Sequence, residues 1–169
     1  MSRSVKSLLA KKSGILLDIG CGTNKQKGFI GMDRRKLPGV DIVHDLESFP
    51  YPLPDNACLS IVGIHIVEHI KPWKMIEFMN ELWRITQPNG QLYFVMPYSV
   101  NDLYVQDPTH CNPCNENTWK YFDPRYEHYQ FYTPKPWLLD PAPRWQASGL
   151  MEVIFRKATD AKMGKDRKG

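Results

Sequence analysis

The chain has 169 residues, a formal net charge of +4 and four cysteines. That length suits a single domain with a sizeable core, no apolar run is long enough to span a bilayer, and the start lacks the apolar segment of a signal peptide. We therefore expect a cytoplasmic protein without a membrane span, in which four cysteines do not predict a disulfide framework.

Residues 15–23 read Ile-Leu-Leu-Asp-Ile-Gly-Cys-Gly-Thr. An apolar run that ends in glycine predicts a buried parallel strand, and glycine beyond its carboxyl end lets a ligand approach the backbone. In open α/β sheets the crevice at that end binds ligands. Any helix before this strand must come from residues 5–12.

The glycine turn departs from the dinucleotide-binding pattern G-x-G-x-x-G. Gly20 and Gly22 are present, but Lys25 stands at the third glycine position. Only about ten residues separate Gly20 from the next strand-like run, residues 29–33, so a helix between them has little room. A cofactor whose diphosphate sits on the first helix is therefore disfavoured.

Acidic residues accompany the first three strand-like runs. Asp18 lies in the first, Asp33 ends residues 29–33, and Asp45 ends residues 41–45. Carboxylates at strand ends can accept hydrogen bonds from ribose hydroxyls and an exocyclic amine. This spacing favours a nucleoside ligand without phosphates.

The next segments predict a strand, a helix and a strand. Residues 59–65 are strand-like, and apolar residues at i, i+3, i+4 and i+7 from Met75 to Leu82 predict an amphipathic helix with Pro72 near its start. Residues 88–90 predict a turn, and residues 92–96 a buried strand stopped by a proline. The order indicates an α/β fold with a doubly wound, mostly parallel sheet and right-handed crossovers.

The composition changes after Pro97. Eight of the 14 prolines and 12 of the 20 aromatic residues fall between Pro97 and Phe155. The stretch is either an irregular cap whose rings form its own core or an acceptor pocket, and both can hold together. We expect extra strands at residues 126–132 and 149–155.

These segments together resemble the class I S-adenosylmethionine-dependent methyltransferases, over residues 15–97 and more weakly to about residue 122. Residues 52–56 resemble the P-x-P-D-N stretch of small-molecule members, and residues 67–70 resemble their L-E-H-I stretch. Residues 80–90 resemble the family's E-x-x-R-V-L-K-P-G-G run. The resemblance implies a Rossmann-like fold, S-adenosylmethionine as cofactor, and methyl transfer.

The resemblance also implies cofactor contacts in the glycine turn and at the strand ends, at Asp18, Gly20, Cys21, Gly22, Asp33, Asp45, Leu46 and His65. Asp33 would take the two ribose hydroxyls, and Asp45 with the Leu46 amide would face the adenine edge. Asp18 would lie near the methionine amine, and His65 would line the cavity near the sulfonium.

We expect direct in-line displacement at the sulfonium methyl, in which positioning does most of the work. A general base is needed only where the acceptor must lose a proton, and the candidates are His69 and His110, with Glu68 beside them. His110 ends an Asp-Pro-Thr-His stretch similar to one in related small methyltransferases. Alternatively, Glu68 and His69 only brace the crevice, and Asp107 and His110 cap a turn.

A metal is not expected. His110, Cys111 and Cys114 have ligand-like spacing, but a structural zinc site needs four ligands, and His128 is the one obvious further candidate. We read the cysteines as ordinary thiols, and the Cys21 thiol as a small filler rather than a nucleophile.

The acceptor is narrowed by motifs that the sequence lacks. The [DNS]-P-P-[YFW] signature of amino-methylating DNA enzymes would follow the fourth strand, where residues 66–69 read Ile-Val-Glu-His. A Pro-Cys nucleophile for cytosine would belong there too, but Pro113 and Cys114 lie elsewhere. We expect a small-molecule acceptor, with protein and RNA left open. A non-catalytic cofactor- or partner-binding scaffold and a cofactor-cleaving enzyme are the alternatives.

The positive charge lies at the two ends of the chain. Residues 1–12 carry four Lys or Arg and no acid, and residues 156–169 carry six against two acids. We expect a methyltransferase-like domain at residues 1–155, with residues 97–145 as the cap or acceptor region. Residues 156–169 would form a solvated basic tail, with contact to nucleic acid or an anionic membrane as the alternative.

Overall fold

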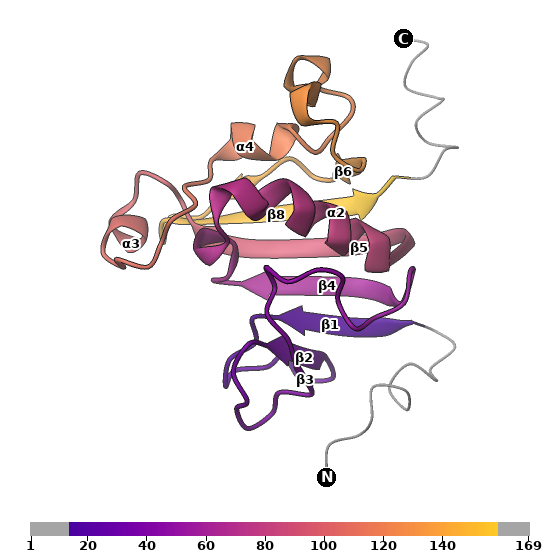
Figure 1. The fold of residues 1–169 in the computed structure, drawn as a ribbon. Helices are drawn as coiled ribbons and strands as arrows, with labels where there is room; N and C mark the ends of the chain where they lie inside the picture. Colours follow the sequence, from indigo (N-terminus) through magenta and orange to yellow (C-terminus); the bar gives the residue numbers. More distant parts are fainter. Residues whose placement is uncertain (1–13, 159–169) are drawn as a thin grey trace.

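An eight-stranded sheet runs through residues 14–158, the part of the chain that the computed structural model describes (Figure 1). The strands follow the order β3-β2-β1-β4-β5-β8-β6, and β7 also pairs with β8. Their bounds are β1 Ile15–Ile19, β2 Ile30–Asp33, β3 Ile42–Val43, β4 Cys58–Ile64, β5 Thr86–Pro97, β6 Trp137–Leu139, β7 Arg144–Trp145 and β8 Leu150–Lys157.

Strands β1 to β5 are parallel, whereas β8 runs antiparallel to its neighbours β5, β6 and β7. The chain moves outward from β1 to β3 and then returns to place β4 on the other side of β1, so the strand order reverses between β1 and β4. The predicted doubly wound, mostly parallel α/β sheet is confirmed. A crevice at this reversal is where such sheets bind ligands.

One amphipathic helix covers a face of the sheet. The 3-10 turn η2 (Pro72–Lys74) leads into α2 (Met75–Ile85), whose apolar side is buried at Phe78, Met79 and Leu82. The Phe78 ring stacks on Phe94 of β5, with centroids 6.1 Å apart. The spacing of apolar residues therefore predicted this helix correctly, because residues at that spacing lie on the side of the helix that packs against the sheet.

Strand β5 begins earlier than the sequence indicated. It starts at Thr86, directly after α2, and includes residues 88–90, where a turn was expected. The register against β4 shifts here, from Cys58 opposite Thr86 to Ser60 opposite Gln91. The extra residues of β5 therefore form a bulge, so the residues that favour a turn lie within the strand.

The segment after β5 builds a cap from short helices, α3 (Asp102–Val105), α4 (Glu116–Lys120) and the 3-10 helix η3 (Glu127–Tyr132). Trp119 of α4 is fully buried, and its ring contacts Phe94 and Phe155 of the sheet. Part of the aromatic cluster is therefore core. α3 lies beyond the carboxyl ends of β1 and β4 (Figure 1).

Of the two extra strands expected in this region, one is present and the prediction of the other is wrong. Residues 149–155 do join a strand, β8, but residues 126–132 form η3. Of the aromatic residues there, Tyr126 packs against the core, whereas Phe131 and Tyr132 are exposed. Tyr129 and Tyr132 both contact the Tyr121 ring, and the Gln130 amide donates to the Asp123 carbonyl, so the chain coils locally.

The segments before β1 and between β1 and β2 were each considered as possible helices. The link between β1 and β2 contains turns and no helix, as its length predicted, while residues 5–12 lie outside the described residues. No helix within residues 14–158 has the length and apolar character needed to cross a bilayer.

The last strand includes residues that the sequence placed in the basic tail. β8 extends through Lys157, and Ala158 is buried, whereas residues 159–169 lie outside the described residues. The Lys157 ammonium donates to Asn56 Oδ1 at 2.8 Å and to the Thr86 carbonyl at 2.7 Å, and it lies 3.8 Å from the centroid of the Trp83 ring. Burial lowers the pKa of Lys157 to about 8.

This buried lysine predicts a pH-dependent stability. Between about pH 8 and the ordinary lysine pKa of 10.5, the unfolded chain binds a proton at Lys157 that the folded chain has released, so the free energy of unfolding rises with pH. Lys157→Met removes this rise. We expect urea unfolding at about pH 7 and about pH 10 to show the wild type gaining stability relative to Lys157→Met.

The exposed Lys36→Met variant is the matched control, because it removes an ammonium that the fold does not bury. Its stability should follow that of the wild type across the same range. Equal pH slopes for the wild type and Lys157→Met would contradict the assignment.

Candidate active site

The turn after β1 can accept only glycine at its first position. Gly20 has a φ of +64°, and a Cβ placed on it would lie 2.6 Å from the Ile66 side chain. Its amide donates to the Met32 carbonyl at 2.8 Å. This close approach joins the ends of β1 and β2 to the segment after β4.

A cavity of about 360 Å³ opens beside this turn, within the size range of small-molecule sites. Six of the residues predicted from the sequence line it, namely Gly20, Asp33, Asp45, Leu46, His65 and His69. Six others were missed, namely Arg34, Arg35, Glu47, Ile66, Ile70 and Thr109. The missed residues mostly adjoin predicted ones in sequence, which is the signal that could have found them.

Asp33, at the end of β2, is the buried carboxylate of the cavity. Its Oδ2 accepts from the Gly22 amide at 2.9 Å, and its Oδ1 accepts from the Arg35 amide at 2.8 Å. Burial raises the pKa of Asp33, but the Arg35 and Gly22 amides and the Arg35 side chain outweigh it, so the pKa lies below its ordinary value. The Arg35 side chain also donates, from Nε to Oδ1 at 3.3 Å, so three of the about four lone-pair positions of the ionised carboxylate are used and about one remains for a ligand.

The loop after β3 contributes a second carboxylate. Asp45 is exposed, and its Oδ1 accepts from the Glu47 amide at 3.0 Å. Leu46 is buried, and its carbonyl accepts from the Tyr51 hydroxyl at 2.8 Å. The Leu46 amide hydrogen has no acceptor among the described residues, so an acceptor edge of a ligand can bind it.

Three of the predicted cofactor residues brace the turn rather than line the cavity. Asp18 Oδ2 accepts from the Gln26 amide at 2.7 Å, and burial raises the pKa of Asp18 against this bond. Burial, with help from Asp18 and Asp33, raises the pKa of Cys21 to about 11, so its thiol keeps its proton. Gly22 holds Asp33 through its amide. Direct contact of these residues with a cofactor stays a prediction.

His65 directly follows β4 and has a left-handed conformation, with a φ of +52° that is uncommon for a residue with a side chain. Its amide donates to the Val95 carbonyl at 2.9 Å. Its Nδ1 lies 3.2 Å from Glu68 Oε1, and this hydrogen bond raises the pKa of His65 against burial. The bend at His65 turns the following 3-10 helix η1 (Val67–His69) toward the cavity.

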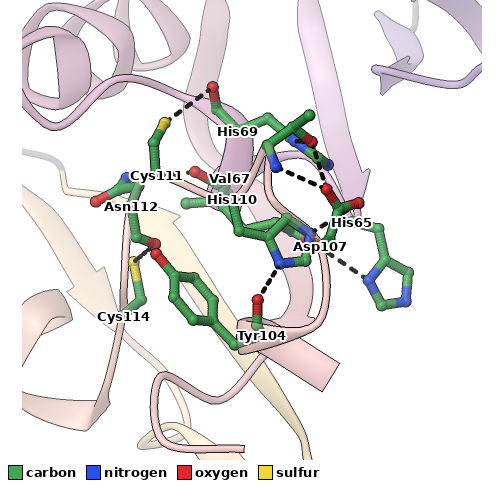
Figure 2. Close-up of polar contacts among 11 residues, drawn as sticks. His65, Val67, His69, Tyr104, Asp107, His110, Cys111, Asn112 and Cys114 are labelled. Carbon is green, nitrogen blue, oxygen red and sulfur yellow. Dashed lines mark hydrogen bonds and ion pairs between the residues drawn. The ribbon is translucent and has the colours of Figure 1, made fainter. Parts of the chain in front are cut away.

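The three predicted catalytic residues, Glu68, His69 and His110, lie close together. Figure 2 shows His69 and His110 with the residues around them. His69 and His110 have ring centroids 4.8 Å apart, and His110 Nε2 lies 4.0 Å from Glu68 Oε1. The loop that carries His110 is tied to η1 because the amides of Cys111 and Asn112 both donate to the Glu68 carbonyl. His69 lines the cavity, whereas Glu68 and His110 lie behind it.

Asp107 caps the turn before His110, as expected if this segment has a structural role. Asp107 Oδ1 accepts from the Thr109 amide at 2.8 Å and from its hydroxyl at 2.7 Å, and these bonds lower the pKa of Asp107. His110 Nε2 lies 3.7 Å from Asp107 Oδ2. The capping and the clustering with Glu68 are therefore both present.

The cysteines do not join this cluster. Cys114 is buried, which raises its pKa to about 12, and its thiol donates to the Asn112 carbonyl. Cys111 is exposed, and its thiol donates to the His69 carbonyl. Within residues 14–158, the group of side chains whose arrangement suits a metal ion is Glu68, His69 and His110.

A family model described as a methyltransferase domain matches residues 1–138, and no curated protein matched the sequence. A S-adenosylmethionine-dependent methyltransferase from Archaeoglobus fulgidus has a similar structure, with 17% identity, coverage of 84% of this chain and 85% of that chain, and a TM-score of 0.59.

Two further structures are similar over most of the chain. The antibiotic-resistance methyltransferase Kmr shares 14% identity, with coverage of 94% of each chain and a TM-score of 0.60. A 16S rRNA (adenine(1408)-N(1))-methyltransferase with cosubstrate S-adenosylmethionine from Catenulisporales acidiphilia shares 12%, covering 91% of this chain and 89% of that chain, with a TM-score of 0.58. At such identities, the likeness shows a common fold.

The close approach at Gly20 predicts a large loss of stability for Gly20→Ala. The substitution adds left-handed strain of about 1–3 kcal/mol and a clash with Ile66 of about 1–3 kcal/mol. Gly22→Ala is the matched control, because its φ is +52° but its added Cβ would lie 3.6 Å from Arg35, so it carries strain alone. Urea unfolding should show the larger loss for Gly20→Ala.

Shortening Ile66 in the Gly20→Ala background should recover part of the difference, since it removes the clashing atoms. Equal losses for the two single variants, or no recovery with Ile66→Ala, would contradict this account.

Proposed function

The chain belongs to the family of class I S-adenosylmethionine-dependent methyltransferase domains, and from this premise we propose that it methylates a small-molecule acceptor by in-line displacement. The family and the fold make it an enzyme that uses S-adenosylmethionine. What remains to be proposed is how this chain holds the cofactor, which acceptor it takes, and which groups act on that acceptor.

The observation that carries the proposal is the Asp33 carboxylate, buried in the cavity wall beside the Gly20 backbone. Its pKa is lowered, and about one acceptor position is left for a ribose hydroxyl. A second hydroxyl would take the place of the Arg35 side chain, which is 62% exposed and can move away. Asp45 and the Leu46 amide lie on the same wall and offer an acceptor and a donor to an adenine edge. The residues present therefore fit a nucleoside cofactor without phosphates.

The bound cofactor supplies a methyl group on a positively charged sulfur. The chain's own part is positional: Asp33 and Asp45 fix the nucleoside, and the glycine turn leaves room for the backbone to pass close to the rest of the cofactor. Holding the acceptor in line with the methyl then removes a large entropic part of the barrier. His65 and His69 line the remaining wall, where the acceptor would approach.

The acceptor class is inferred from the walls and the limited size of the cavity. Its volume of about 360 Å³ is that of a site for one small molecule, and the proposed cofactor would occupy most of it, so only a small part of an acceptor can enter beside the methyl group. We place the acceptor at the wall lined by His65, His69 and Thr109, whose polar side chains can bind an acceptor hydroxyl or amine. His69, with His110 and Glu68 behind it, is then the group that draws the acceptor's proton away.

We predict that Asp33→Asn weakens cofactor binding by about 10- to 100-fold, because each charge-assisted hydrogen bond contributes about 1.5–3 kcal/mol. Calorimetric titration of S-adenosylmethionine and S-adenosylhomocysteine measures this. The control is Asp140→Asn, whose carboxylate is exposed after β6 and pairs with Arg156. It should bind like the wild type. No binding to a folded wild type would sink the proposal.

Transfer of a labelled methyl group tests the acceptor. We expect label from S-adenosylmethionine to enter the small-molecule fraction of a cell extract treated with the enzyme. Label in RNA or protein instead would overturn the acceptor class. Binding without any transfer would support the scaffold alternative, and consumption of cofactor without a methylated product would support cofactor cleavage.

A further inference from the structure

Three side chains that can ligate a metal ion meet where β4 runs into η1. Glu68 and His69 come from η1, and His110 comes from the loop after α3 (Figure 2). One ligand atom from each lies within 4.8 Å of the others. Proximity alone does not make a metal site, so the hydrogen bonds around each residue decide the matter.

The hydrogen bond of His110 fixes its tautomer. His110 Nδ1 lies 2.8 Å from the Tyr104 carbonyl, which can only accept, so Nδ1 carries the hydrogen. A neutral ring then turns the Nε2 lone pair toward Glu68 Oε1 at 4.0 Å and Asp107 Oδ2 at 3.7 Å. A lone pair that faces two carboxylates is repelled unless a proton or another cation lies between them.

His69 is oriented by a similar outer contact. Its Nδ1 lies 3.2 Å from Thr109 Oγ1, and the Thr109 hydroxyl donates to Asp107 Oδ1 at 2.7 Å. Because that hydroxyl has one hydrogen, its oxygen accepts from the His69 ring, and the ring keeps a nitrogen with a lone pair. Metal-binding histidines are commonly held this way, with the outer N–H donated to a carbonyl, carboxylate or other acceptor.

Glu68 supplies an independent observation. Its side chain is 1% exposed, and its Oε2 is buried with no hydrogen-bond partner among the described residues. Its other oxygen lies 3.2 Å from His65 Nδ1. A buried carboxylate oxygen without a partner is costly. A proton on His110 would remove the repulsion at Nε2 but would leave Oε2 unpartnered, whereas a metal ion that is bound through both carboxylate oxygens would remove the repulsion and also give Oε2 a partner.

We propose that Glu68, His69 and His110 bind a divalent transition-metal ion of the zinc type at the wall of the cavity. Two imidazoles and a carboxylate are a ligand set that zinc accepts while keeping a further position open. Since His69 lines the cavity, the open position can take an oxygen of the acceptor. This last part rests on the proposed function, whereas the metal site itself does not.

With the ion bound, His69 is a ligand and its lone pair can no longer accept the acceptor's proton. The ion would take over this role by lowering the pKa of the acceptor hydroxyl. The O–H bond breaks and its proton passes to solvent, the oxygen forms a bond to the methyl carbon, and the carbon–sulfur bond breaks to leave neutral S-adenosylhomocysteine. No oxidant or reductant is required.

The test is calorimetric titration of Zn²⁺ into the full chain after treatment with a chelator, with Co²⁺ absorption as a second readout of the ligand geometry. We expect one equivalent to bind. His110→Ala and Glu68→Gln should weaken binding by more than about 100-fold, because even second-shell partners of a metal are worth about 10- to 100-fold. The matched controls are His128→Ala in η3 and Cys111→Ser, both exposed, and they should bind like the wild type.

Absence of Zn²⁺ binding by the folded wild type would overturn the site, as would binding that Cys111→Ser removes and His110→Ala keeps. Titration of S-adenosylmethionine into the same chelated and zinc-loaded samples separates the two proposals, since we expect cofactor binding in both. Its failure in both would sink the proposed cofactor site and leave the metal site standing. Full methyl transfer after chelation would overturn the role of the ion in acceptor activation.

Discussion

The contact between Gly20 and Ile66 is the constraint on which the site depends. It brings the turn after β1 so close to the segment after β4 that no side chain fits at residue 20. The chain after β4 must bend at once, and His65 takes a left-handed conformation to do so. η1 follows directly, which places His69 at the cavity wall and Glu68 behind it. The close approach of the Ile66 side chain to Gly20 thus positions the residues that line both sides of the cavity, Asp33 on one side and His69 on the other.

The absence of a helix between β1 and β2 in the described chain shows how a short member of this fold keeps a pocket wall. The turn is held by side chains instead of helical hydrogen bonds. Asp18 accepts from the Gln26 amide, and Asp41 Oδ2 accepts from the Lys25 ammonium at 2.7 Å and the Gly31 amide at 2.8 Å. Carboxylates that bind backbone amides can fix a loop as firmly as a local helix, because the bonds are charge-assisted.

The parts that the sequence predicted are those with local signals. Apolar runs and the spacing around Phe78 predicted the strands and α2, and the acids at strand ends pointed to Asp33 and Asp45. The predictions failed where contacts with residues distant in sequence determine the local structure. The bulge in β5 depends on its register with β4, and η3 depends on rings that contact Tyr121. The meeting of His110 with Glu68 depends on amides donated across 43 and 44 residues, which no local pattern encodes.

Glu68 is a residue at which the fold departs from what stability alone would select. A buried carboxylate oxygen without a hydrogen bond costs about 1–3 kcal/mol, and replacement by an apolar side chain would remove that cost. Its neighbours do not offset it, because the lone pair of His110 points toward the same carboxyl group. A site that leaves a buried polar group unpartnered, with no gain in stability elsewhere, is a site where function is expected. The tautomer that the Tyr104 carbonyl imposes on His110 turns a lone pair toward the same carboxyl group, which is why we propose that the missing partner is a metal cation.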